Sequence, residues 1–146
     1  MEGYGEVVEA GSGCNQRQIG DSVIIGTQFG SYAEYIVIDE SQALPAVSDF
    51  TPEENAAFAV NYMTAWVSLM DIARLRPSDS VLIQVAAGGV GTAAVQIAKA
   101  YGCRVFGTAS SDEKLRLLED LKVDVPINYN KTDFTDLVRL ENSLFK

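Results

Sequence analysis

An uncharged stretch at residues 80–98 contains three glycines. Their types and spacing are the strongest indication of ligand binding in this sequence. Residues 80–85 favour a strand and a helix is expected from residue 90, so the glycines stand in a turn between them. Backbone N–H groups and the positive end of a helix converge at such a turn, where they bind phosphate. The pattern fits the dinucleotide fingerprint, with candidate binding residues Ala87, Gly88, Gly89, Val90 and Gly91. The alternative is a tight turn that binds nothing.

The residues at the end of the next expected strand indicate which dinucleotide is bound. NAD-selective sites place an Asp or Glu there to hold the ribose 2′-hydroxyl, whereas this strand ends in Thr108-Ala109-Ser110-Ser111. Two hydroxyls, and Lys114 one turn into the following helix, favour a 2′-phosphate and hence NADP (NADPH). Alternatively, Ser111 only caps that helix and Lys114 belongs to its solvated first turn. Tyr129, after the third expected strand, is either near the adenosine or a packing residue.

Composition excludes several other kinds of chemistry. The chain has no histidine, which removes the commonest general base, the Ser-His-Asp relay and the usual zinc ligand, so we expect no metal site. Cys14 and Cys103 are too far apart for a Cys-x-x-Cys redox site. Hydride transfer requires neither a metal nor a nucleophile from the protein.

Charge and hydropathy limit the partners. The net charge of −9 makes nucleic acid an improbable partner. Residues 1–70 carry all of that excess, while residues 71–146 are neutral and can host an anionic cofactor. Two glutamines and the glycine pair within the uncharged stretch argue against a membrane span. No basic, apolar leader follows Met1, so we expect a cytoplasmic protein.

Periodicity predicts an α/β protein with a parallel sheet in its second half. The elements expected there are strands at residues 80–85, 104–108 and 125–128, each followed by a helix, at residues 90–101, 112–121 and 133–140. Ahead of them, residues 7–8, 22–25 and 32–38 read as short β segments of a meander or partial barrel. A helix begins at Thr51-Pro52-Glu53-Glu54 and a helical stretch continues over residues 61–73.

An ordered set of segments resembles one protein family. The chain is similar to the middle of zinc-independent quinone oxidoreductases of the medium-chain dehydrogenase/reductase superfamily, the group of zeta-crystallin and the vesicle amine transport protein homologues. The matching segments are Glu2-Gly3-Tyr4-Gly5, Val7-Val8-Glu9, Gly20-Asp21-Ser22-Val23, Gly30-Ser31-Tyr32-Ala33-Glu34-Tyr35, Val60-Asn61-Tyr62-Met63-Thr64-Ala65, the turn at 86–91, Thr108-Ala109-Ser110-Ser111 with Lys114, and Ile127-Asn128-Tyr129.

This resemblance implies a fold, an activity and several site residues. It implies part of a GroES-like catalytic β-barrel at residues 1–50, connecting helices at 51–79, and a partial Rossmann domain (parallel βαβαβ) that binds NADP at 80–146. Proteins of this family transfer hydride from NADPH to a quinone or an α,β-unsaturated carbonyl (enone). Their pyrophosphate turn matches Gly88–Gly91, their 2′-phosphate residues match Ser110 or Ser111, Lys114 and Tyr129, and a threonine near the nicotinamide matches Thr64.

Two departures from the family pattern affect these expectations. Val85 stands where many relatives have Ala or Gly; it is bulkier, but its side chain can still face the core of the sheet. Family chains are also over twice as long, so the substrate-pocket segment before Met1 and the strands of the usual dimer edge after Lys146 have no counterpart. The resemblance allows a homo-oligomer for full-length proteins of the family, and we do not expect one for this chain. The alternative to a reductase is a non-catalytic protein that binds NADPH or mediates an interaction.

Overall fold

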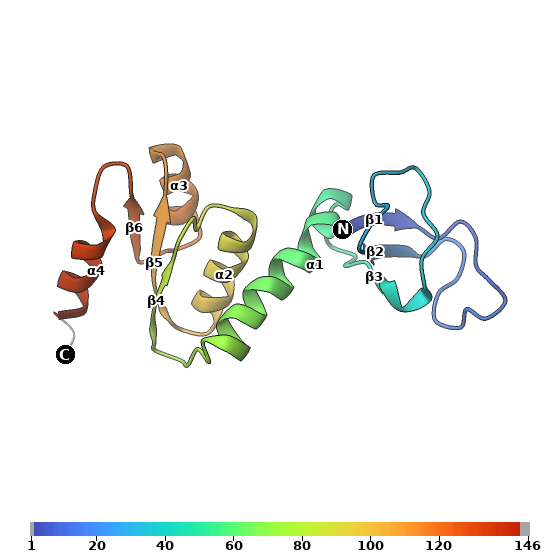
Figure 1. The fold of residues 1–146 in the computed structure, drawn as a ribbon, viewed down its shortest axis with the longest axis horizontal. Helices are drawn as coiled ribbons and strands as arrows, with labels where there is room; N and C mark the ends of the chain where they lie inside the picture. The colour runs from blue at the N-terminus through green and yellow to red at the C-terminus, as the bar shows by residue number, and fades with distance from the viewer. Residues whose placement is uncertain (1, 144–146) are drawn as a thin grey trace. The chain divides into compact units, whose positions relative to one another are not determined.

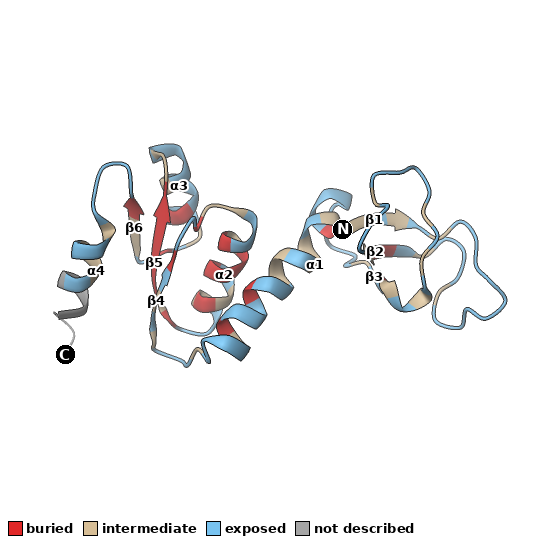
Figure 2. Ribbon diagram, viewed as in Figure 1, coloured by how far each residue is buried: buried red, intermediate tan, exposed pale blue. Residues whose placement is uncertain are grey.

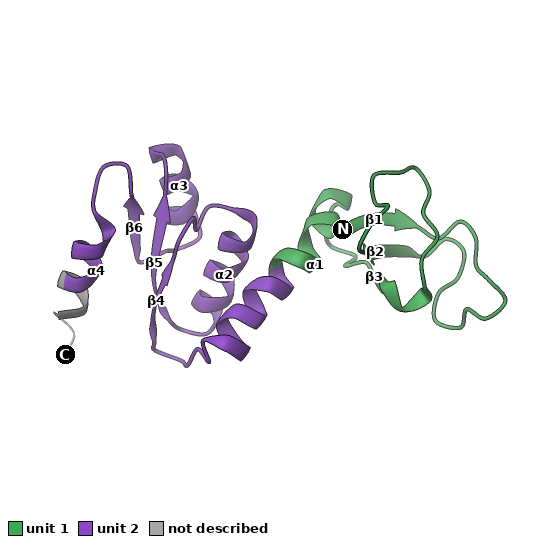
Figure 3. Cartoon of the chain, viewed as in Figure 1, with its two compact units in different colours: residues 1–61 green, residues 62–146 purple. Residues whose placement is uncertain are grey.

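The computed structural model describes residues 2–143, which form two compact units at residues 1–61 and 62–146 (Figures 1 and 3). The first unit is built around an antiparallel sheet and the second around a parallel sheet. Helix α1 (Pro52–Trp66) contributes residues to both units. Each unit is described below by itself.

The sheet of the first unit is a meander of three short strands. These are β1 (Glu2–Glu6), β2 (Ser22–Gly26) and β3 (Ala43–Pro45), in the order β1-β2-β3. Ile24, in the central strand, is opposite Tyr4 on one side and Leu44 on the other. A 3₁₀ turn, η1 (Glu40–Gln42), leads into β3.

The expected β segment at residues 32–38 is wrong, since the structure has no strand there. Tyr32 and Val37 are fully exposed in this part of the first unit, where Figure 2 shows mostly exposed chain. β-Favouring residues form a strand only when a neighbouring strand pairs with their backbone, and the described ladder joins β1, β2 and β3 alone. The first strand also lies earlier than the expected residues 7–8, and β3 was not expected.

Helix α1 begins where the sequence predicts, with a reciprocal cap. The backbone N–H of Glu54 donates to the Thr51 hydroxyl (3.2 Å), and the N–H of Thr51 donates to the Glu54 carboxylate (2.8 Å). The expected helical stretch over 61–73 is confirmed, although its last part is a π-helix, η2 (Val67–Ile72). Ala65 and Leu69 on this stretch are buried in the core of the second unit.

The second unit has the alternating strands and helices that periodicity predicts. They are β4 (Ser80–Ile83), α2 (Gly89–Ala100), β5 (Arg104–Ala109), α3 (Asp112–Asp120), β6 (Val125–Asn128) and α4 (Phe134–Ser143). The three strands are parallel in the order β4-β5-β6, which confirms the partial Rossmann sheet. Ile83 pairs with Gly107, and Ala109 with Asn128, so the carboxyl ends of the strands form one edge.

The core of the second unit lies between this sheet and its helices (Figure 2). Helix α2 packs on β4 and β5 through small residues, and α3 packs on β5 and β6. Leu118 of α3 is fully buried, with Leu115 and Leu121 packed against the same core, as their spacing predicts. Among residues 2–143, no helix combines the length and the apolar character needed to cross a bilayer.

Candidate functional site

The segment that joins β4 to α2 forms a tight turn, and together with the first three residues of α2 it makes up residues 84–91, which we call the glycine turn. Its backbone is tied to the neighbouring strand through Thr108, which is buried near the end of β5. The N–H of Val85 donates to the Thr108 hydroxyl (3.1 Å), and the N–H of Ala86 donates to the Thr108 carbonyl (2.8 Å). The glycine turn is therefore attached to the carboxyl edge of the sheet by both the backbone and the side chain of one residue.

Gly91 is required by the close packing of α2 on this turn. A Cβ atom at Gly91 would lie 2.3 Å from the carbonyl oxygen of Val85 and 2.8 Å from the backbone of Ala86. These neighbours are backbone atoms and cannot move aside as a flexible side chain could. At Gly88 a Cβ would approach the same oxygen to 3.3 Å, which is tight but tolerable. Close packing of helix and strand is the role that the dinucleotide fingerprint gives to its last glycine, which here is Gly91.

The first turn of α2 offers unused N–H groups. Helical hydrogen bonding begins with the N–H of Thr92 donating to the Gly88 carbonyl (2.7 Å), so the N–H groups of Gly89, Val90 and Gly91 have no acceptor inside the helix. The N-cap residue is Gly88, which supplies no side-chain acceptor. Such an end carries a partial positive charge and binds anions.

An open depression of about 330 Å³ lies at this helix end. Its lining includes four of the five residues expected to bind phosphate, while Ala87 is half-buried and is not part of the lining. The lining residues are Ile83, Gln84, Val85, Gly88, Gly89, Val90, Gly91 and Ala94. The walls are mainly apolar, and their polar groups come from the backbone of the glycines and from Gln84.

The expectation that Val85 faces the core of the sheet is wrong. Its φ angle is +51°, and 58% of its surface is exposed. A positive φ turns the side chain away from the alternation of the strand, which ends at Ile83. A β-branched residue is strained in this region of φ, so the structure accepts a local cost at the glycine turn.

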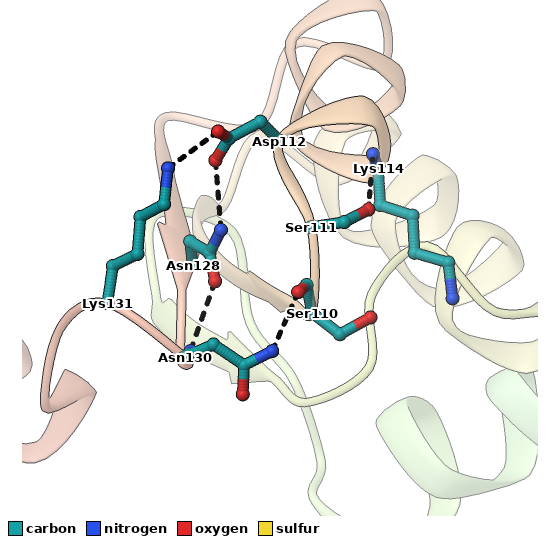
Figure 4. Close-up of polar contacts among 7 residues, drawn as sticks. All are labelled: Ser110, Ser111, Asp112, Lys114, Asn128, Asn130 and Lys131. Atoms are coloured by element: carbon teal, nitrogen blue, oxygen red, sulfur yellow. Dashed lines mark hydrogen bonds and ion pairs between the residues drawn. The ribbon is translucent and has the colours of Figure 1, made fainter.

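The residues expected near a 2′-phosphate follow β5. Ser111 is the N-cap of α3, and its hydroxyl accepts a hydrogen bond from the N–H of Lys114 (3.3 Å). The capping role that was the alternative for Ser111 is thus present. Ser110 is half-buried, and the Lys114 side chain is exposed. In Figure 4 the side chains of Ser110 and Lys114 extend to the same side of the loop.

The two remaining candidates lie apart from the glycine turn in sequence and do not line its depression. Tyr129 directly follows β6, is 42% exposed, and donates its N–H to the carbonyl of Ala109 at the end of β5 (3.1 Å). Thr64 is exposed on α1, where its carbonyl accepts a hydrogen bond from the Ser68 hydroxyl (2.7 Å). The exposure of both side chains leaves them accessible to a ligand.

Side chains that sequence reasoning missed join the loops after β5 and β6, and we call them the strand-tip network (Figure 4). Asn128 donates to one oxygen of Asp112 (2.9 Å), and Lys131 donates to the other (2.6 Å). Asn130 donates from its side chain to the carbonyl of Ser110 (2.8 Å) and from its N–H to the Asn128 side chain (3.0 Å). The hydrogen bond from Lys131, then that from Asn128, lowers the pKa of Asp112.

Comparison with known proteins agrees with this geometry. Residues 89–141 match the family model described as zinc-binding dehydrogenase. The chain is 41% identical over 140 residues to the synaptic vesicle membrane protein VAT-1 homolog of Rattus norvegicus, covering 95% of this chain and 34% of that protein. It is 38% identical over 137 residues to a probable quinone oxidoreductase of Leishmania amazonensis, covering 93% of this chain and 39% of that protein.

A solved structure shows that the fold also agrees with that of known proteins. The Escherichia coli quinone oxidoreductase complexed with NADPH superposes with a TM-score of 0.89 at 27% identity, over 97% of this chain and 44% of that one. This chain is a quinone oxidoreductase-like sequence of the medium-chain dehydrogenase/reductase superfamily. The resemblance carried by the sequence motifs is confirmed. The chain spans about a third to two-fifths of the length of these two curated relatives.

The matching family model is described as a zinc-binding dehydrogenase, which raises the question of whether this quinone oxidoreductase-like chain has the ligands of a zinc site. The sequence contains no histidine. Within residues 2–143, no three His, Cys, Asp or Glu side chains come together in a group that could hold a metal ion. Cys103 is buried, and burial raises the pKa of its thiol, which disfavours the thiolate that binds metals.

Proposed function

We propose that this chain forms the coenzyme-binding part of an oxidoreductase that transfers hydride from NADPH to a quinone or an α,β-unsaturated carbonyl. The observation that carries the proposal is the packing at Gly91, which brings the uncapped first turn of α2 to the open depression. The names of the quinone oxidoreductases among the relatives support the reaction class, and the NADPH in the Escherichia coli complex supports the coenzyme.

The glycine turn meets the requirements of a pyrophosphate. Three backbone N–H groups without helical acceptors supply hydrogen bonds, and the dipole of α2 favours negative charge. No side chain rises from Gly88 or Gly89, so the phosphates could approach the backbone closely. The second unit carries no net charge, and its field therefore does not oppose an anionic coenzyme.

The loop after β5 suits a phosphorylated ribose. Ser110 and Ser111 offer hydroxyl groups, and the first turn of α3 adds Lys114 as a cation. Tyr129, exposed beyond β6, is proposed to contact the adenosine side. We assign the preference for NADPH over NADH to these groups, because a 2′-phosphate gains from hydroxyl donors and an ammonium while a bare hydroxyl gains little.

Bound NADPH would supply the hydride, and this chain's residues would bind and orient it. The apolar residues that line the depression, Ile83, Val85 and Val90, would limit water around the ligand. Thr64 is proposed to contact the nicotinamide through its exposed hydroxyl. No catalytic acid is assigned, because the anion formed on a quinone or enone can take its proton from solvent.

The test measures binding and turnover separately. NADPH is titrated into the full chain by intrinsic fluorescence, and oxidation of NADPH is followed at its absorbance band with 1,4-benzoquinone present. Gly88→Ala should weaken NADPH binding about tenfold, because the added methyl group occupies the approach of the pyrophosphate.

Gly26→Ala is the matched control, because nothing lies within 4 Å of a Cβ added there, and it should bind NADPH as the parent does. Failure of NADPH to bind the parent chain would contradict the proposal as a whole. Binding without oxidation of NADPH would instead favour a non-catalytic NADPH-binding protein.

A further inference from the structure

Asp112 occupies a position that conflicts with a preference for NADPH. It directly follows Ser111 and is the first residue of α3, three residues beyond the end of the second strand of the parallel sheet. NAD-selective proteins hold the ribose 2′-hydroxyl with a carboxylate at the end of this strand, and a carboxylate a few residues further on would repel a 2′-phosphate. The question is what the chain does with this carboxylate.

Both carboxylate oxygens of Asp112 accept hydrogen bonds, from residues at the end of β6 and in the loop after it. The amide of Asn128, which is only 7% exposed, donates to Oδ1, and the ammonium of Lys131 donates to Oδ2. The Asp112–Lys131 ion pair itself is exposed, with 63% of each side chain accessible. Lys131 therefore offsets the carboxylate charge, while Asn128 fixes its direction from a buried position.

The same network holds the residues on both sides of Ser111, Ser110 by its backbone and Asp112 by its side chain. Asn130 donates to the carbonyl of Ser110, and Asn128 and Lys131 hold the side chain of Asp112. In Figure 4, Asp112 and Lys131 lie on one side of this loop, while Ser110 and Lys114 extend to the other. The carboxylate is thus directed away from the groups assigned to the 2′-phosphate.

We propose that Lys131 and Asn128 are positioning residues for coenzyme preference. They hold Asp112 in a neutralised, outward position, so that the loop presents Ser110, Ser111 and Lys114 to a 2′-phosphate. This inference rests on the proposed NADPH site. It adds that the preference depends on residues at the end of β6 and just after it, which do not contact the coenzyme themselves.

The experiment compares the dissociation constants of NADH and NADPH for the full chain and its variants. Lys131→Met should lower the ratio of the NADH constant to the NADPH constant about five- to tenfold, because Asp112 becomes an unpaired negative charge. Lys122→Met is the matched control: it removes the same charge from an exposed position after α3 and should leave the ratio within about twofold. Asn128→Ala should lower the ratio in the same direction.

Rescue distinguishes positioning from damage to the fold. Adding Asp112→Asn to Lys131→Met removes the repelling charge and should return the ratio to within about twofold of the parent. A ratio unchanged in Lys131→Met, or lowered equally by Lys122→Met, would overturn the inference while the NADPH site stands. A ratio that stays low in the double variant would also overturn it. A parent chain that binds neither coenzyme would overturn the proposed function and this inference with it.

Discussion

The glycine turn and the strand-tip network lie at the same edge of one parallel sheet but are built by different forces. The glycine turn is shaped by backbone packing, in which α2 approaches so closely that Gly91 has no room for a side chain. The strand-tip network is shaped by side-chain hydrogen bonds between residues such as Asp112 and Asn128. A site held by packing should fail abruptly when atoms are added, whereas a polar network should lose function gradually as its members are removed.

The strongest test of this contrast is Gly91→Ala. We expect it to lower the free energy of unfolding by about 3 kcal/mol, although alanine favours a helix, because its Cβ would lie 2.3 Å from the Val85 carbonyl oxygen. Urea denaturation followed by circular dichroism measures the change. Gly88→Ala, the same substitution where the contact is 3.3 Å, should cost less than about 1 kcal/mol. Equal losses in the two variants would show that packing does not distinguish these glycines.

A smaller loss of stability is expected at Thr108, which supports the glycine turn through both its side chain and its backbone. Thr108→Val keeps the shape of the side chain but removes the hydroxyl that accepts from the N–H of Val85. The free energy of unfolding should fall by about 1–2 kcal/mol, the cost of leaving one partner of a partly buried hydrogen bond unpaired. The exposed Thr132 provides the control, and Thr132→Val should change stability by less than about 0.5 kcal/mol. A loss below that value at Thr108 would mean that its hydroxyl does not support the glycine turn.

The two regions also differ in how far the sequence predicts them. The glycine turn and the order and approximate positions of β4, α2, β5, α3 and β6 follow from local patterns: periodicity, the glycines, and the cap at Ser111. The strand-tip network could not be predicted in this way, because Asn128 and Asp112 are joined by a side-chain hydrogen bond across the sheet edge. Polar residues after a strand are common, and nothing local indicates which of them pair.

The predictions for residues 32–38 and for Val85 are wrong for related reasons. The β-favouring residues at 32–38 lack a paired strand in the described structure, and propensity alone does not order a strand. Val85 continues the apolar run of β4, but the strand ends at Ile83 and the chain turns with a positive φ. In both cases the tertiary contacts of the backbone determine the outcome, and the local sequence pattern does not reveal them.

Val85 allows the strain of the glycine turn to be measured. Val85→Gly should raise the free energy of unfolding by about 0.5 kcal/mol, because relief of the φ of +51° exceeds the entropy cost of glycine and little buried surface is lost. Thermal denaturation at two scan rates is a suitable measurement. Val85→Ala keeps the unfavourable φ and should show no such gain. Destabilisation by Val85→Gly would indicate that the exposed side chain packs on the turn.

The smallest expected effect is the response of the strand-tip network to acid. Hydrogen bonds from Lys131 and Asn128 lower the pKa of Asp112 in the folded chain, so the carboxylate stabilises the fold while it is ionised. That contribution is present above the pKa of the unfolded chain and is lost as the pH falls through the lower folded value. The difference in unfolding free energy between the parent and Asp112→Asn should therefore stay constant from about pH 7 to pH 5 and shrink below about pH 4. A difference that grows on acidification would have the opposite sign and would show that Asp112 is not held in its ionised form by this network.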